Sequence, residues 1–283
     1  MEPVTLGSGR SYLLFRPQVA GPVPLVLMLH GTGGSAAFAA DETGLAAFAA
    51  AEGFAVAFPD GLPVKPHEPA RFLTNPQRWN DGSTRHGDLL HSDTDDVGYL
   101  TEVVFDAIQR ANADPARVYL TGFSNGAGMA FRFAAERAEL LAAVAPLAGY
   151  CHLPEPRPIR PVPTLYIVGD SDLLIPLHGG TVRLPWGNRT EVRPPVSDTL
   201  AKWATAIGCR AKPEESLEDR MVRAVFPPLS RFALEFAAVV VHGLGHHWPG
   251  GKGQFNPRLG GPTSDRLDGN REIWSFFRRH RLQ

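Results

Sequence analysis

The chain alternates short, continuous apolar runs with longer segments whose apolar residues recur every three to four positions. Continuous runs of this kind predict strands buried on both faces, as in a parallel sheet. They lie at residues 11–15, 25–29, 54–58, 118–121, 142–147, 164–168 and 237–241. Helical spacing predicts helices over residues 43–52, 100–111, 127–137 and 197–207. This alternation predicts an α/β fold with a mostly parallel central sheet, helices on both of its faces, and functional residues at the carboxyl ends of the strands.

A candidate nucleophile follows the fourth of these strands. The run at residues 118–121 leads directly into Gly122-Phe123-Ser124-Asn125-Gly126, and a helical pattern begins immediately afterwards. Strand, sharp turn and helix in this order present a serine hydroxyl for attack on a carbonyl. The glycines two residues either side of Ser124 lack the Cβ atoms that would block such a turn. Ser124 is therefore the candidate nucleophile.

Two later strand ends carry the groups that a serine nucleophile needs. One ends in a turn containing Asp170 and Asp172, and the last is followed by a glycine-rich loop containing His246 and His247. A histidine would accept the Ser124 proton, and a carboxylate would orient the imidazole. The order serine, acid, histidine along the chain is that of the α/β-hydrolase triad. We favour Asp172 as the acid over Asp170, whereas either histidine could serve as the base on chemical grounds alone.

An oxyanion-binding loop is predicted after the strand at residues 25–29. His30-Gly31-Thr32-Gly33-Gly34 forms a glycine-rich bend that can turn a backbone N–H towards a developing oxyanion. Thr32 is the candidate first donor, and Asn125, which follows the nucleophile, is the candidate second donor. A dinucleotide-binding loop is disfavoured because the glycines do not have the G-x-G-x-x-G spacing.

Length and composition agree with one compact enzyme. The chain has 283 residues and a formal net charge of −1, and we expect a single catalytic domain over residues 1–283. So small a net charge gives no electrostatic reason to expect nucleic acid or an anionic membrane as a partner. No apolar stretch approaches the roughly 20 residues needed to cross a bilayer. Nor do the first 16 residues follow the pattern of a signal peptide.

Several motifs together resemble the polyhydroxybutyrate depolymerase and feruloyl or acetylxylan esterase family. The resemblance covers about residues 5 to 280 and is carried by His30-Gly31-Thr32-Gly33-Gly34, Trp79-Asn80-Asp81-Gly82, Asp95-Asp96-Val97-Gly98-Tyr99, Gly122-Phe123-Ser124-Asn125-Gly126, and the loop at residues 243–251. The family's His-x-Trp-Pro-Gly element implies that His246 is the catalytic histidine. Its acid position implies Asp172. The resemblance favours export from the cell. We also expect a reaction without cofactor or metal, and we favour a monomer.

Substrate contacts are predicted from two loops. The long segment from Pro59 to Asp93 leaves a strand on the catalytic edge and contains Trp79 and Asn80, which either contact substrate or pin the loop. Trp248, in the histidine loop, is a third candidate for substrate binding. Residues 181–196 are expected to form a loop insertion that contributes a rim.

The sequence therefore predicts a serine esterase acting on small or polymeric carboxylic esters, such as feruloyl or acetyl esters of plant polysaccharide or hydroxyalkanoate polyesters. An acyltransferase would use the same triad and differ in the acceptor that reaches the acyl-enzyme. A binding module that keeps the fold without the reaction is the other alternative. Cys151 and Cys209 permit one disulfide, and two buried thiols are equally compatible with the sequence.

Overall fold

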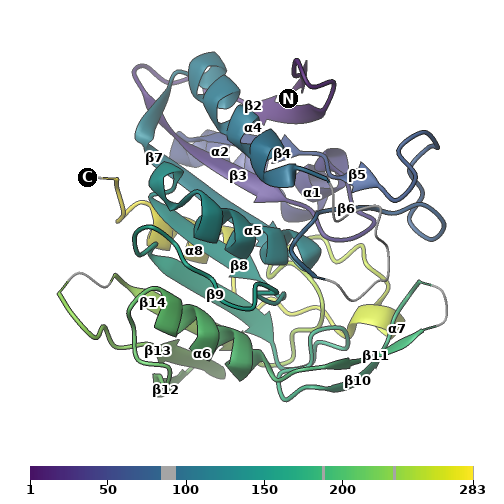
Figure 1. Cartoon of the computed structure of the whole chain (residues 1–283), viewed down its shortest axis with the longest axis vertical. Coiled ribbons are helices and arrows are strands. Elements are labelled where there is room, and N and C mark those ends of the chain that lie inside the picture. The colour runs from purple at the N-terminus through teal and green to yellow at the C-terminus, as the bar shows by residue number, and fades with distance from the viewer. Residues whose placement is uncertain (84–93, 187–188, 232–233, 283) are drawn as a thin grey trace.

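The fold centres on a 10-stranded sheet, which Figure 1 shows with helices in front of it and behind it. The computed structural model describes residues 1–83, 94–186, 189–231 and 234–282. The strands of this sheet, in the order in which they lie side by side, are β1 (Glu2–Thr5), β2 (Ser11–Phe15), β4 (Ala55–Pro59), β3 (Val23–Leu29), β7 (Ala113–Phe123), β8 (Ala143–Leu147), β9 (Thr164–Gly169), β14 (Phe236–Val241), β13 (Met221–Val225) and β12 (Glu214–Glu218). From β4 to β14 the neighbours run parallel, and the strands added at either edge run antiparallel. The predicted mostly parallel sheet is thereby confirmed.

Helices cover both faces of the sheet, as the sequence predicts. They are α1 (Ala36–Thr43), α2 (Leu45–Glu52), α4 (Asp96–Ala111), α5 (Asn125–Glu136), α6 (Val196–Ala206), α7 (Pro257–Gly260) and α8 (Gly269–Phe277). One buried apolar cluster contains side chains of α4, α5 and α6, and a second contains side chains of α1, α2 and α8. Because β3, β4, β8 and β9 lie between these clusters, all of their residues are buried. This explains their continuous apolar sequences.

The structure differs from the predicted elements in three places. The helix predicted at residues 43–52 is present as α2 and ends at Gly53 as expected, but an additional helix, α1, precedes it, separated by Gly44 in the left-handed conformation with φ 61°. The rim expected to be a loop insertion at residues 181–196 contains an antiparallel hairpin, β10 (Gly180–Arg183) and β11 (Thr190–Arg193). No strand was predicted for the antiparallel pair β12 and β13, which extends one edge of the sheet.

The parallel strands place four predicted site segments at one edge of the sheet. The loops after β3, β7, β9 and β14 all leave carboxyl ends, and these strands share a single direction. The long loop expected at residues 59–93 is described only as far as residue 83, and it includes the short pair β5 (Leu62–Pro63) and β6 (Gln77–Arg78). Within the described ranges, the helices are too short or too polar to span a bilayer.

Candidate active site

Ser124 lies on a strained turn between β7 and α5. Its φ of 58° and ψ of −117° are a combination that residues other than glycine rarely adopt, at a cost of about 1–3 kcal/mol. The turn is held by hydrogen bonds from Ser124 N to Leu147 O at 2.9 Å and from Ala127 N to Ser124 O at 3.0 Å. A Cβ on Gly126 would lie 2.4 Å from Leu29 O, so only glycine lets α5 start this close to β3. The local structure is therefore the strand, sharp turn and helix that the sequence predicts.

Asp172 and His246 form a buried hydrogen-bonded pair across the loops after β9 and β14. His246 Nδ1 lies 2.8 Å from Asp172 Oδ2, and the two residues are each 4% exposed. The other carboxylate oxygen accepts hydrogen bonds from the backbone N–H groups of Leu174 at 2.8 Å and Ile175 at 2.7 Å. These bonds fix the carboxylate, which in turn fixes the imidazole tautomer with its proton on Nδ1. Nε2 is consequently the nitrogen that can accept a proton.

The imidazole of His246 packs beside the turn that carries the serine. Its ring centroid lies 4.6 Å from that of Phe123, the residue before Ser124. Its backbone N–H donates to Gly260 O at 2.7 Å, which ties the histidine loop to α7. The structure thus brings the histidine loop to the same place as the serine turn.

The alternative residues of the sequence analysis occupy other positions. Asp170 Oδ2 lies 2.6 Å from His242 Nδ1, and its Oδ1 accepts from Gly243 N at 2.8 Å, so it holds the turn after β14 at the surface. His247 is buried, with Nε2 at 2.9 Å from Gly261 O. The structure therefore pairs His246 with Asp172 and gives Asp170 and His247 contacts outside that pair.

The loop after β3 holds the peptide between Gly31 and Thr32 in a fixed orientation. Gly31 O lies 2.8 Å from His30 Nδ1 and accepts from Gly34 N at 3.0 Å. The C=O and N–H of one trans peptide point in opposite directions, so these bonds turn the Thr32 N–H away from His30 and Gly34. Among the described residues, neither the Thr32 N–H nor the Asn125 N–H has a hydrogen-bond acceptor. Two free donors next to a serine turn are what an oxyanion requires.

The tautomer of His30 is set by its own surroundings. Its Nε2 accepts from Gly61 N at 2.9 Å, which leaves the proton on Nδ1 for donation to Gly31 O. Burial lowers the pKa of His30, which keeps the ring neutral as this arrangement requires. The sequence analysis gave His30 no separate role, and only its place in the glycine-rich motif could have pointed to one.

Trp79 and Trp248 are enclosed by protein, and Asn80 is half-buried. Trp79 is 2% exposed and donates from Nε1 to His30 O at 2.9 Å, so it pins its loop beneath the oxyanion segment. Asn80 donates from Nδ2 to Thr94 O at 3.0 Å. Trp248 is 3% exposed and donates from Nε1 to Asn270 Oδ1 at 3.0 Å. The two indoles therefore do not form surface walls, and Trp248 reaches the site only by lining an apolar cavity.

That cavity adjoins the imidazole of His246. The cavity is small, with a volume of about 40 Å³, and its lining includes Phe38, Phe123, His246, Trp248 and Phe255. Most of the exposed lining atoms are apolar. A small hydrocarbon group attached to an ester carbonyl could therefore enter it without leaving a buried polar group unpaired.

Three aromatic side chains from separate loops gather beside the same site. Phe72 lies with its ring centroid 5.5 Å from that of Trp186 and 6.2 Å from that of Phe255. Trp186 Nε1 also donates to Phe72 O at 2.7 Å, and the Phe255 ring lies 6.1 Å from that of His246. Trp186 falls in the predicted rim. Phe72 and Phe255 were not predicted, because isolated aromatic residues in loops follow no periodic pattern.

The two cysteines do not form a disulfide. Cys151 and Cys209 are both free and buried, and burial raises the pKa of the Cys151 thiol to about 11. A thiol with so high a pKa is a poor nucleophile at neutral pH. Within the described parts of the chain, no cluster of three or more histidine, cysteine, aspartate or glutamate side chains could hold a metal ion.

Comparison with solved structures identifies the fold. The acetyl xylan esterase from Aspergillus awamori matches with a TM-score of 0.60 at 15% sequence identity, over 87% of this chain and 93% of that one. At this identity the likeness concerns the fold. The chain therefore has the α/β-hydrolase fold.

Sequence comparison then gives the family. The model of the esterase PHB depolymerase family matches residues 10–153. NocK of Nocardia uniformis subsp. tsuyamanensis, an esterase by name, is 33% identical over 284 residues that cover 94% of this chain and 78% of NocK. Feruloyl esterase B of Piromyces equi is 28% identical over 205 residues, covering 68% of this chain but only 34% of that protein. The chain belongs to the esterase PHB depolymerase family and is a carboxylic ester hydrolase.

Proposed function

We propose that this hydrolase cleaves carboxylic esters with Ser124 as nucleophile, His246 as general base and acid, and Asp172 as the group that orients and stabilises the imidazole. The observation that carries the proposal is the buried pair of His246 and Asp172, whose imidazole packs against the residue preceding Ser124. The backbone N–H groups of Thr32 and Asn125 would bind the oxyanion.

The reaction would proceed through an acyl-enzyme. As Ser124 Oγ forms a bond to the ester carbonyl carbon, its proton passes to His246 Nε2, and the carbonyl oxygen becomes an oxyanion facing the two N–H groups. Collapse of this intermediate breaks the bond to the alkoxy oxygen, which leaves as the alcohol with the proton from His246. Water then repeats the sequence on the acyl-enzyme, releasing the acid and restoring the serine.

The acyl group is proposed to be apolar or aromatic. The apolar cavity beside His246 suits a hydrocarbon group, and Phe72, Trp186 and Phe255 offer ring faces on which an aryl group could stack. One relative is named a feruloyl esterase. We therefore propose feruloyl or acetyl esters of polysaccharides as substrates in preference to a hydroxyalkanoate polyester.

Two measurements test these proposals. Ser124→Ala should lower turnover of p-nitrophenyl acetate by about 10⁴- to 10⁶-fold with an unchanged circular dichroism spectrum, and a folded variant that keeps its activity would disprove the nucleophile. Initial rates of the wild type on methyl ferulate, acetylated xylan and a hydroxybutyrate oligomer then test the substrate. Faster hydrolysis of the oligomer would contradict the proposed preference, and esters formed when an alcohol is added would reveal acyl transfer.

A further inference from the structure

A short segment, Trp79, Asn80 and Asp81, is docked against the first turn of α5. We call this segment the brace. Asn125 Oδ1 accepts from Trp79 N at 2.7 Å, and Asn125 Nδ2 donates to Trp79 O at 3.1 Å and to Asp81 Oδ2 at 2.8 Å. The amide of Asn125 thus makes the same pair of hydrogen bonds with the brace that a neighbouring strand would make. Since Asn125 also carries a free backbone N–H, its side chain fixes the residue that supplies the second oxyanion donor.

Asp81 is the charged member of the brace, and it is almost enclosed. It is 4% exposed, and its Oδ1 accepts from Ser83 N at 3.0 Å while Nε2 of His152 lies 3.5 Å from its Oδ2. Burial disfavours the charged carboxylate, but the nearby His152 and the hydrogen bonds from Ser83 and Asn125 outweigh burial and lower the pKa of Asp81. A Cβ on Gly128 would lie 2.7 Å from Asp81 Oδ2, so the carboxylate is pressed against the first turn of the helix.

The sign of the Asp81 charge shows what kind of role it can have. A negative carboxylate near an oxyanion hole repels the charge that develops there, so its electrostatic effect alone would slow the reaction. A contribution to catalysis must therefore come from geometry. Asp81 can influence the geometry of Asn125 because its Oδ2 accepts a hydrogen bond from Asn125 Nδ2 at 2.8 Å.

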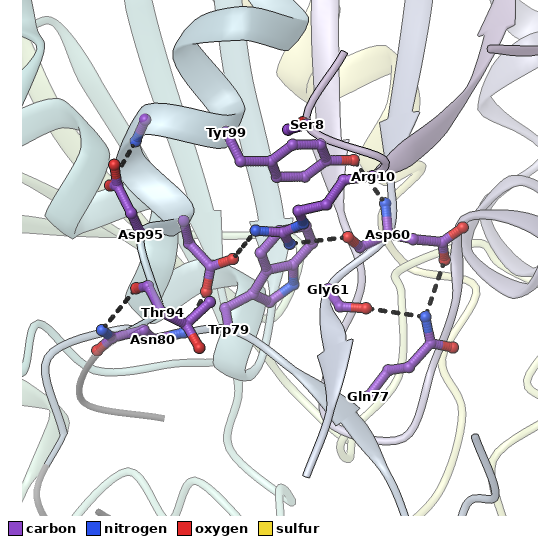
Figure 2. A network of polar contacts seen from close by, with 12 residues as sticks. Ser8, Arg10, Asp60, Gly61, Gln77, Trp79, Asn80, Thr94, Asp95 and Tyr99 are labelled. Atoms are coloured by element: carbon purple, nitrogen blue, oxygen red, sulfur yellow. Dashed lines mark hydrogen bonds and ion pairs between the residues drawn. The ribbon is translucent and has the colours of Figure 1, made fainter. Parts of the chain in front are cut away.

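The network in Figure 2 connects Asn80 of the brace to the segment at Asp60 and Gly61. Arg10 donates to Asp96 Oδ1 at 2.6 Å and to Asp60 O at 3.0 Å, and its guanidinium lies 3.6 Å from the centroid of the Tyr99 ring. On one side, Asp96 Oδ2 accepts from Asn80 N at 2.6 Å, which fixes the middle of the brace. A single arginine thus joins the brace to the segment at Asp60.

The other side of this network reaches the oxyanion loop. The Gln77 side chain donates from Nε2 to Gly61 O at 2.9 Å, and the backbone carbonyl of Gln77 accepts from Gly33 N at 2.7 Å. Gly61 N donates to His30, which holds the peptide of Thr32. The two segments that carry the oxyanion donors are therefore held at a fixed separation by side chains behind them.

We propose that Asp81 is a positioning residue that acts through the Asn125 side chain to aim the second oxyanion donor. The proposal rests on the proposed function, because it requires an oxyanion at Ser124. Asp81 itself touches no reacting atom. Its effect should appear in the transition state and not in the binding of the ester, since the donor it aims is needed only when the carbonyl oxygen becomes charged.

Kinetics of Asn125→Ala and Asp81→Asn test this role. Each should lower kcat for p-nitrophenyl acetate by about 10- to 100-fold while KM changes by less than about threefold, because a displaced donor weakens only transition-state binding. Asp114→Asn is the matched control. Asp114 also fixes neighbouring groups, because it accepts hydrogen bonds from Ala116 N at 2.9 Å and Arg117 Nε at 2.8 Å, but it lies at the opposite end of β7. Its kcat should remain that of the wild type.

Inhibitor affinity separates positioning from general loosening of the fold. A trifluoromethyl ketone forms an oxyanionic adduct with serine, so its inhibition constant should rise in parallel with the fall in kcat/KM. Binding of an ether analogue of the substrate, measured with Ser124→Ala as the parent protein, should not change when Asp81→Asn is added. Equal weakening of both ligands, or an unchanged kcat in Asn125→Ala and Asp81→Asn, would overturn the proposal. An active Ser124→Ala would instead disprove the proposed function.

Discussion

Two histidine–aspartate pairs bridge the same two loops, and they differ mainly in burial. Asp172 and Asp170 both follow β9, and their partners His246 and His242 both follow β14. The inner pair has side chains that are 5% exposed for His246 and 0% for Asp172. The outer pair is 58% exposed for His242 and 29% for Asp170, although its N···O distance of 2.6 Å is the shorter. Hydrogen-bond length therefore does not distinguish the pair at the site.

The difference lies in what surrounds each imidazole. His246 packs against Phe123 beside the serine turn, whereas His242 projects into solvent. Water screens the outer pair and lets its imidazole reorient, so its contribution to stability is small. In the inner pair, the backbone N–H groups of Leu174 and Ile175 fix the carboxylate, and the imidazole borders an apolar cavity. Fixed orientation, more than the presence of the two residue types, makes a pair suitable for proton transfer.

The largest expected difference follows from removing each histidine. His246→Ala should lower kcat on p-nitrophenyl acetate by about 10⁴- to 10⁶-fold, because the serine proton then has no acceptor. His242→Ala should leave kcat within about twofold of the wild type. Steady-state kinetics on the two purified variants provide the test. If His242→Ala were the more damaging change, the assignment of the base would be wrong.

Replacing each carboxylate should give a smaller but still large difference in kcat between the two variants. Asp172→Asn keeps the shape of the side chain but presents an amide to Nδ1, so the imidazolium loses its stabilising charge and the correct tautomer is no longer enforced. We expect kcat to fall by about 10³- to 10⁴-fold. Asp170→Asn should change kcat by less than about threefold. The same ester assay distinguishes the two, and a greater loss in Asp170→Asn would reverse the roles.

Aromatic packing is the next feature that separates the pairs. The Phe255 ring lies 6.1 Å from that of His246, and the two rings meet edge to face at 72°. Edge-to-face contacts contribute about 0.5–1.5 kcal/mol, so Phe255→Ala should lower kcat by roughly 2- to 10-fold as the imidazole gains freedom. Phe105→Ala is the control, since Phe105 is 54% exposed on α4. Equal kinetic losses in both variants would argue against this effect.

The sequence predicted the parts of this arrangement that depend on strand order. Runs such as β3 and β9 are apolar throughout because both faces are covered, and motifs at their carboxyl ends necessarily meet at one edge. The edge strand β12 was not predicted because all of its residues are exposed, so burial imposes no alternation on Glu214–Glu218. The two short strands of the β10 and β11 hairpin were not predicted for the same reason, because they are mostly exposed.

Site residues in loops depend on contacts that no local pattern records. In the sequence, Asp81 appeared only as one residue of the motif at residues 79–82. The positioning role that we propose for it depends on its carboxylate lying 2.8 Å from Asn125 Nδ2. Trp79 could have been a substrate wall or a pin, and only its burial beneath His30 distinguishes these. Side chains that act on neighbours distant in sequence are identified by tertiary packing alone.

The smallest expected effect concerns the outer pair and appears in stability. Burial alone would raise the pKa of Asp170, but hydrogen bonds from His242, Gly243 and Ser171 outweigh it and lower that pKa below the ordinary value. A carboxylate with a lowered folded-state pKa stabilises the protein above its unfolded-state pKa of about 3.9, and this contribution disappears as the pH falls through the folded-state value. Because the pair is exposed, the contribution should remain below about 1 kcal/mol. Urea unfolding should therefore show the wild type slightly more stable than Asp170→Asn at pH 5, with the difference shrinking at pH 3. A difference that grows on acidification would mean that the hydrogen bonds do not favour the ionised carboxylate, and the outer pair would then need another explanation.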